Sequence, residues 1–328
     1  MKRYFIFAVV LLSVVVLSSV PAFAQAVITS GDVSLGVGLT GELGAGSLPS
    51  GSNDAGAMYG IYYAPTMQDA IAPGCFCEGW GVSINNTTSG YSANANGSSG
   101  TINSVSFTST ASTATAVTTL GSTGLQISQA YAPSAASNVL FEDTVTLTNT
   151  SGTAMTNVEY ARAMDWDIPP TEFDEYVTIG GVGASDLVFS NDNGFCAPNP
   201  LGSCSEIVSG TTNVNFTTAG PTDQGSYFVF DFGTLAAGDS TTFDIFYGAG
   251  ADNATVWSAL GTVGAEVYAL GYNSSTGAPG FNDPTWAFGF SGVGGTPVTP
   301  GVTPEPTTFM LLGTGLATLI GRKLRRSA

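Results

Sequence analysis

The sequence predicts an all-β protein, an antiparallel β-sandwich with one late helix, and three observations support this fold class. Hydrophobic residues make up 43% of the chain and charged residues only 9%, the reverse of a disordered composition. Short segments of alternating apolar and polar residues are separated by turns rich in Gly, Ser, Asn and Thr. The sequence lacks the alternation of strands and helices that is typical of a parallel sheet.

The first third of the body predicts the less regular strands. Residues 27–39 predict one or two strands, and residues 58–63 and 79–85 predict one each. Residues 86–124 are dominated by Thr, Ser, Ala and Gly, so we expect edge strands and loops there. Residues 108–115 contain a Thr-x-Thr pattern typical of water-ordering faces, but one such rung does not define a face.

The clearest strands are predicted in the middle of the chain, at residues 125–131, 139–149 and 158–166. In the second strand, Phe141, Val145 and Leu147 predict an apolar face, with Asp143 and the threonines largely opposite. The second and third strands are expected to form a hairpin. One face of the third strand carries Val158, Tyr160, Arg162, Met164 and Trp166.

Arg162 is the only basic residue between Gln25 and Thr303. Since its neighbours on the strand face are Tyr160 and Met164, we expect a half-buried guanidinium that stacks on an aromatic ring and pairs with an acid. Binding of an anionic ligand is the alternative.

Later segments predict five more strands, one helix and a closing strand. The strands are expected at residues 176–180, 186–190, 212–217, 226–232 and 240–247. Helical spacing begins after Asp252 or Asn253 and continues to Leu270; a strand pair is the alternative, because Gly261 and Gly264 weaken a helix. Trp286, Phe288 and Phe290 alternate as the closing strand.

The expected domain organisation is one body at residues 25–291, with two subdomains split near residue 121 as the alternative. Residues 292–303, rich in Gly, Pro and Thr, predict a linker. Residues 1–24 predict a signal peptide: a basic start, an apolar run and Ala22-Phe23-Ala24, a site for signal peptidase.

Three parts follow one another in residues 304–328. They are Pro304, Glu305 and Pro306, then an apolar span at residues 307–321, then the basic residues Arg322, Lys323, Arg325 and Arg326. A helix over this span would be about 22 Å long, short against a hydrocarbon core of about 30 Å. The basic cluster favours a cytoplasmic end, so the body is expected outside the membrane.

This arrangement resembles the PEP-CTERM sorting signal of Gram-negative bacteria, which a membrane transpeptidase of the exosortase type recognises. The resemblance covers about 25 of 328 residues. It implies export, transient anchoring in the inner membrane, cleavage near Pro-Glu-Pro, and delivery to the cell surface or its exopolysaccharide matrix. Tails of this kind are also named after the C-terminal domains of ice-binding proteins. A plain C-terminal membrane anchor is the alternative.

Charge restricts the partners of the body. All 24 acidic residues except Glu305 lie between Gln25 and Thr303, against Arg162 alone, which gives this segment a formal charge of −22. Such a surface repels phosphate backbones and excludes nucleic acid. Calcium, neutral sugars and cationic surfaces remain as partners, and simple acidic solubility is the alternative.

Four cysteines in an exported chain predict disulfides. They form two local groups, Cys75 with Cys77 and Cys196 with Cys204, and both local pairing and a cross-link between the groups are open. Metal ligation is disfavoured, because the chain has no histidine and neither group has the Cys-x-x-Cys spacing of zinc sites.

Five acids within eleven residues predict a calcium site, with a solvated acidic loop as the alternative. They are Asp165, Asp167, Glu172, Asp174 and Glu175. Pro169 and Pro170 direct the chain from a strand end into a loop, where oxygen ligands suit Ca²⁺. Residues 191–194 are a second candidate loop.

The absence of histidine excludes Ser-His-Asp, Cys-His and His-ligated zinc mechanisms. We therefore expect a non-catalytic surface or matrix protein, adhesive to polysaccharide or ice, with no cofactor other than calcium. The alternative is a secreted carbohydrate-active enzyme that uses the paired carboxylates of residues 165–175, with Trp166 stacked on a sugar.

Overall fold

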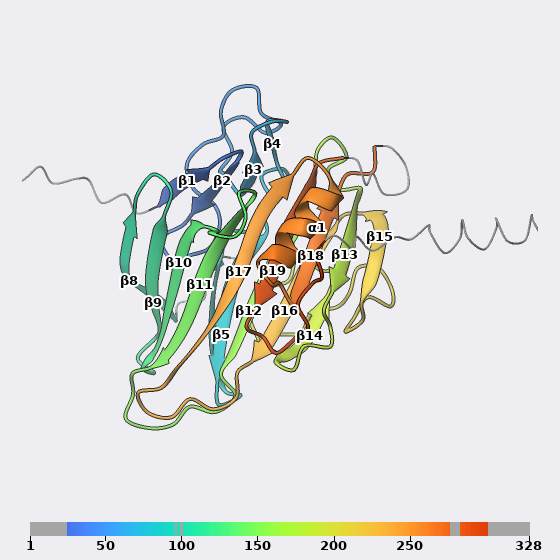
Figure 1. Cartoon of the computed structure of the whole chain (residues 1–328). Coiled ribbons are helices and arrows are strands. Elements are labelled where there is room, and N and C mark those ends of the chain that lie inside the picture. Colours follow the sequence, from blue (N-terminus) through green and yellow to red (C-terminus); the bar gives the residue numbers. More distant parts are fainter. Residues whose placement is uncertain (1–24, 96, 99–100, 276–282, 301–328) are drawn as a thin grey trace, which may run out of the picture.

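Three antiparallel sheets and one helix make up the part of the chain that the structure describes (Figure 1). The structure is a computed structural model, and it describes residues 25–95, 97–98, 101–275 and 283–300. The expected signal peptide and the sorting signal at residues 304–328 lie outside these ranges. The predicted all-β class and the single late helix are confirmed.

The largest sheet has nine strands in the order β15-β13-β18-β19-β17-β11-β10-β9-β8. Their bounds are β8 Ile102–Ser109, β9 Ala114–Leu120, β10 Leu125–Pro133, β11 Leu140–Asn149, β13 Glu175–Gly180, β15 Phe216–Thr222, β17 Ser240–Gly250, β18 Val267–Tyr272 and β19 Thr285–Ser291.

The second sheet has six strands in the order β14-β16-β12-β5-β6-β7, and a third, smaller sheet has the order β1-β2-β3-β4. The six strands are β5 Glu78–Ile84, β6 Thr88–Ala93, β7 Gly97–Ser98, β12 Glu159–Trp166, β14 Leu187–Asn191 and β16 Gln224–Asp231. The four strands of the small sheet are β1 Ala26–Ser30, β2 Val33–Val37, β3 Ile61–Tyr63 and β4 Gln68–Asp69.

Buried side chains from all three sheets form one hydrophobic cluster between the sheets. Aromatic rings dominate its centre: Tyr160 stacks with Trp80 and meets Phe243 edge to face, and Phe228 meets Phe288 edge to face. Strands on both sides of residue 121 pair with each other, β9 with β10 and β5 with β12. The chain before and after residue 121 thus shares both large sheets and one core.

The hairpin expected from residues 139–149 and 158–166 is wrong, although both segments are strands. β11 pairs with β10 and β17 in the nine-stranded sheet, whereas β12 pairs with β5 and β16 in the six-stranded sheet. The turn after Asn149 therefore carries the chain from one sheet to the other. In each strand the predicted apolar side chains face the core, but the pairing partners come from elsewhere in the sequence.

The helix is shorter than its apolar spacing predicts. α1 spans Asn253–Thr262, and the Asp252 side chain accepts a hydrogen bond from the Thr255 amide at 2.7 Å, as an N-cap does. Gly264 then takes a φ of +69°, and residues 267–272 form β18 instead of a further helical turn. Val256 and Leu260 pack against the outer face of the nine-stranded sheet.

Residues 292–300, expected to be a linker, lie against the body. Val293 is fully buried, and the amides of Val293 and Gly295 both donate to Oε2 of Glu266 at 2.9 Å. Further along, the Val298 amide donates to the Ala265 carbonyl at 2.7 Å. In the described ranges no helix is both long and apolar enough to cross a membrane.

Arg162 is fully buried rather than half-buried, and it joins the two large sheets. From β12 its guanidinium forms a salt bridge with Glu78 on the neighbouring β5, with Nε 2.6 Å from Oε1. Nη1 donates to Gln129 Oε1 of β10 across the sandwich at 3.1 Å. Cζ also lies 5.3 Å from the centre of the Tyr247 ring on β17.

Asp143 lies in the core as well, contrary to its predicted position opposite Phe141 and Val145. Residues 141, 143 and 145 share one side of β11 because side chains alternate with period two, and Asp143 is 0% exposed. Burial raises the pKa of Asp143 to about 7, and the charge of Arg162 opposes that rise.

We predict that Arg162→Met destabilises the fold by about 3–5 kcal/mol, because it leaves the buried Glu78 carboxylate without its charge partner. The double variant Arg162→Met, Glu78→Gln should recover part of this loss, since no uncompensated charge then remains. Urea unfolding followed by tryptophan fluorescence measures both. A cost below about 1 kcal/mol for the single variant would contradict this role of the pair.

Candidate functional site

Four carboxylates converge at one end of the sandwich, and we call them the carboxylate cluster: Asp165, Asp167, Glu175 and Asp223. Asp165 is the next-to-last residue of β12, Asp167 follows the end of that strand, and Glu175 opens β13. Asp223 is the single residue between β15 and β16. The cluster thus takes side chains from both large sheets.

The three aspartates are close enough to share one ligand. One carboxylate oxygen each from Asp165, Asp167 and Asp223 lie within 4.8 Å of one another. Glu175 belongs to the same electrostatic group, because its charge raises the pKa of Asp165 and the charges of Asp167 and Asp223 raise its own pKa.

Two of the five acids predicted from the sequence lie at the rim rather than in the cluster. Glu172 is half-buried and Asp174 is exposed. They act through their charges, Glu172 on the pKa of Asp167 and Asp174 on that of Asp223. Asp223 was missed, because it lies far away in sequence and only the return from β15 to β16 brings it to Asp165.

Three members of the cluster are buried, Asp223 is half-buried, and the cluster is short of hydrogen-bond donors. Asp165 and Asp167 are each 1% exposed and Glu175 is 0% exposed. Both carboxylate oxygens of Asp167, Oδ1 of Asp165 and Oε2 of Glu175 have no hydrogen-bond partner. Glu175 Oε1 is satisfied, since it accepts from the Gln224 amide at 3.0 Å.

Burial, and to a smaller extent repulsion among the carboxylates, raises the pKa values of the cluster. Burial and the charge of Asp223 raise the pKa of Asp167 to about 8. Burial raises the pKa of Glu175 to about 9, and it raises that of Asp165 well above its ordinary range. Arg162, the only base within the described ranges, forms its salt bridge with Glu78 and not with a member of this cluster.

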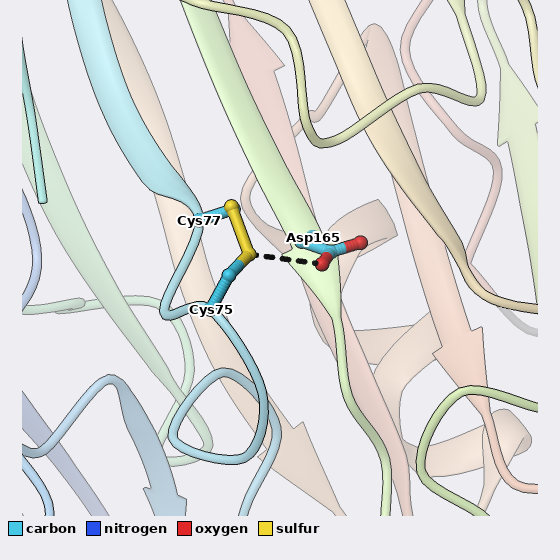
Figure 2. A group of neighbouring side chains, drawn as sticks. All are labelled: Cys75, Cys77 and Asp165. Atoms are coloured by element: carbon cyan, nitrogen blue, oxygen red, sulfur yellow. Dashed lines mark hydrogen bonds between the residues drawn. A yellow bond between two sulfur atoms is a disulfide. The ribbon is translucent and has the colours of Figure 1, made fainter. Parts of the chain in front are cut away.

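A disulfide covers one side of the cluster. The structure pairs Cys75 with Cys77 and Cys196 with Cys204, which are the two local connectivities. Figure 2 shows the first bond against Asp165, with Sγ of Cys75 3.6 Å from Oδ2. Gly74 in the same loop approaches Asp167 so closely that a Cβ there would lie 3.1 Å from Oδ2. This loop helps to exclude water from the carboxylates.

The second candidate loop, residues 191–194, has its acid satisfied by the protein. Asp192 Oδ1 accepts from the Ile207 amide and the Thr211 hydroxyl, and Oδ2 accepts from the Val208 amide, all at 2.8 Å. These bonds hold the 205–211 segment in place. Gly194 packs directly on the backbone of Asp165, so this loop forms another wall of the cluster.

Trp166 is 0% exposed, so its ring is not available for stacking on a sugar. It lies instead over Gly271 of β18, where a Cβ would come within 2.9 Å of the indole. Only a glycine fits at this close approach of strand to ring.

A second feature is a hydroxyl-rich face on the outer side of the nine-stranded sheet, which we call the hydroxyl face. Cross-strand registers align its residues in three rows over β9, β10, β11 and β17. The rows are Thr119, Gln126, Thr148 and Ser240; Val117, Ser128, Thr146 and Thr242; and Thr115, Ala130, Thr144 and Asp244. Each of these residues is exposed or half-buried.

Two comparisons with known proteins bear on this chain. A family model described as the PEP-CTERM protein-sorting motif matches residues 302–326. No curated protein matches the chain. The C-terminal segment is therefore a PEP-CTERM sorting signal, and the chain is an exported protein of the kind that exosortase processes and sorts to the cell surface of Gram-negative bacteria.

We predict that the metal-free protein is more stable at pH 5 than at pH 8. Burial raises the pKa of Asp69 to about 6 and that of Asp143 to about 7. Above about pH 4 the folded state then binds more protons than the unfolded state, so the free energy of unfolding falls as the pH rises. Thermal unfolding in EDTA across this range measures the trend.

Asp143→Asn is the matched variant for this measurement. It removes one of the buried acids, so the fall in stability between pH 5 and pH 8 should become shallower. A stability that rises with pH throughout this window would contradict the prediction.

Proposed function

We propose that the exported body is a non-catalytic surface or matrix protein that adheres to neutral polysaccharide through the hydroxyl face. The observation that carries this proposal is the alignment of its hydroxyl groups. Eight of the twelve aligned positions are Thr or Ser, set on neighbouring strands of one sheet. Strands lie about 4.8 Å apart and alternate residues about 6.8 Å apart along a strand, so the array is regular.

The chemistry of this face suits a polymer that is itself rich in hydroxyl groups. A Thr or Ser hydroxyl both donates and accepts, as a sugar hydroxyl does. Single bonds of this kind add only about 0.5–1.5 kcal/mol each, so adhesion requires many of them at once. Apart from Asp244, which accepts a hydrogen bond from Thr144 at 2.9 Å, the aligned positions are uncharged.

The run of threonines noted in the sequence belongs to this face only in part. Thr115 is one of the aligned residues, and Thr108 lies beside it on the edge strand β8. The sequence showed one rung, whereas the other rungs come from β10, β11 and β17. Because the aligned hydroxyl groups extend over several neighbouring strands, they form an extended surface that supports a binding role better than one short Thr-x-Thr run does.

We predict that the triple variant Thr119→Val, Thr146→Val, Thr148→Val binds polysaccharide at least tenfold more weakly, because it removes three hydroxyls and keeps the side-chain shape. Thr217→Val is the matched control, since Thr217 is exposed on β15 at the opposite end of the same sheet. Purified protein is incubated with a panel of polysaccharides, and retention and released reducing ends are measured separately.

Failure of the wild-type protein to be retained on any polysaccharide would end the adhesion proposal. Equal retention of the triple variant would move adhesion to another surface. Release of reducing ends would favour the carbohydrate-active enzyme as the function. Retention on ice crystals but on no polysaccharide would indicate that ice is the ligand.

The sorting signal generates a separate prediction about the mature chain. We expect the protein isolated from its host to lack residues 1–24 and the segment after Pro306, because signal peptidase and exosortase remove the two ends. Intact-mass spectrometry of the surface fraction measures both. A mature chain that retains Arg322 and the residues after it would support the plain membrane anchor.

A further inference from the structure

Within the described part of the protein, several buried oxygens of the carboxylate cluster have neither a basic partner nor a hydrogen-bond donor. Buried carboxylates are ordinarily paired with a base, hydrogen-bonded or bound to a metal. Asp167 is 1% exposed, yet neither of its oxygens has a partner, and Oδ1 of the equally buried Asp165 has none. These unpartnered oxygens, buried beside one another, point to a positively charged ligand.

The geometry of the three aspartates fits a calcium ion. Calcium binds carboxylate oxygens at 2.3–2.6 Å, so two ligands on opposite sides of the ion are separated by up to about 5 Å. The 4.8 Å limit on the oxygens of Asp165, Asp167 and Asp223 falls inside that span. Magnesium, at 2.0–2.1 Å, requires a tighter set and retains more of its water.

We propose that Asp165, Asp167 and Asp223 bind one Ca²⁺ ion, with Glu175 beside them, and that this ion ties the two large sheets together. Asp165 belongs to the six-stranded sheet and Glu175 to the nine-stranded sheet, while Asp223 lies where the chain passes from one to the other. Oε2 of Glu175 also has no partner, but Glu175 is outside the group of three whose oxygens lie within 4.8 Å of one another. The ion replaces the repulsion among these acids by attraction to a common centre.

This site is independent of the proposed adhesion. The hydroxyl face lies on β9, β10, β11 and β17, whereas the cluster lies on β12, β13 and the β15–β16 turn. A protein that binds calcium without binding polysaccharide, or the reverse, therefore separates the two proposals.

The test is calcium binding by the purified full-length protein after EDTA treatment, at one fixed pH. Isothermal calorimetry measures binding of CaCl₂ directly, and thermal unfolding measures the stabilisation. Terbium chloride is the second probe, because Trp166 adjoins two of the ligands in the chain and should sensitise terbium emission when excited. Asp167→Asn and Asp223→Asn are the variants, with Asp239→Asn, an exposed aspartate outside the cluster, as the control.

Calcium should raise the melting temperature of the wild-type protein and of Asp239→Asn, and magnesium at equal concentration should raise it less. Both cluster variants should bind calcium at least tenfold more weakly and lose the sensitised terbium emission. In EDTA they should be at least as stable as the wild type, since each removes one repelling charge. A purely structural role for these acids predicts the opposite order in EDTA.

Absence of binding heat and of any shift in melting temperature at millimolar calcium would overturn the proposal. So would cluster variants that respond to calcium as the wild type does.

Discussion

The buried ion pair between Arg162 and Glu78 is the constraint on which the arrangement of the two large sheets depends. A guanidinium in an apolar core must keep its hydrogen-bond partners, because an unpaired charge there is far more costly than any single packing contact. Arg162 takes its hydrogen-bond partners from β5, β10 and β12, and its guanidinium also lies over the Tyr247 ring on β17. Sliding one sheet over the other would separate this set, so the pair favours one register of the sandwich.

The strands and their inward faces could be predicted from the sequence, since alternation depends only on local geometry. Tyr160, Arg162 and Trp166 all face the core as expected. Pairing could not be predicted, because β11 and β12 have equally good patterns for a hairpin and for a crossing between sheets. The prediction for Asp143 is wrong for a different reason. A charged residue is expected on the solvent side even where the alternation places it on the core side. Arg162, whose charge favours the ionised form of this buried carboxyl, is on another strand.

In the candidate site, too, residues close together in sequence could be predicted, whereas a residue brought in by the fold could not. Asp165, Asp167 and Glu175 were found because they lie in one acidic stretch, while Asp223 has no acidic neighbour within seven residues of it that would mark it. The hydroxyl face was almost invisible in the sequence for a related reason. Threonines and serines spread over four strands are unremarkable one by one, and their alignment exists only once the registers are known.

Because residues 292–300 pack against the body, they limit how far the sorting signal can lie from the body. Pro300 still lies against Gly261 of α1, and Pro304 is only four Cα steps further on. Those steps reach at most about 14 Å, less than the diameter of a small domain. A membrane enzyme that grips Pro304 therefore meets the side of the body that carries α1, and steric fit against that helix becomes part of access to the signal.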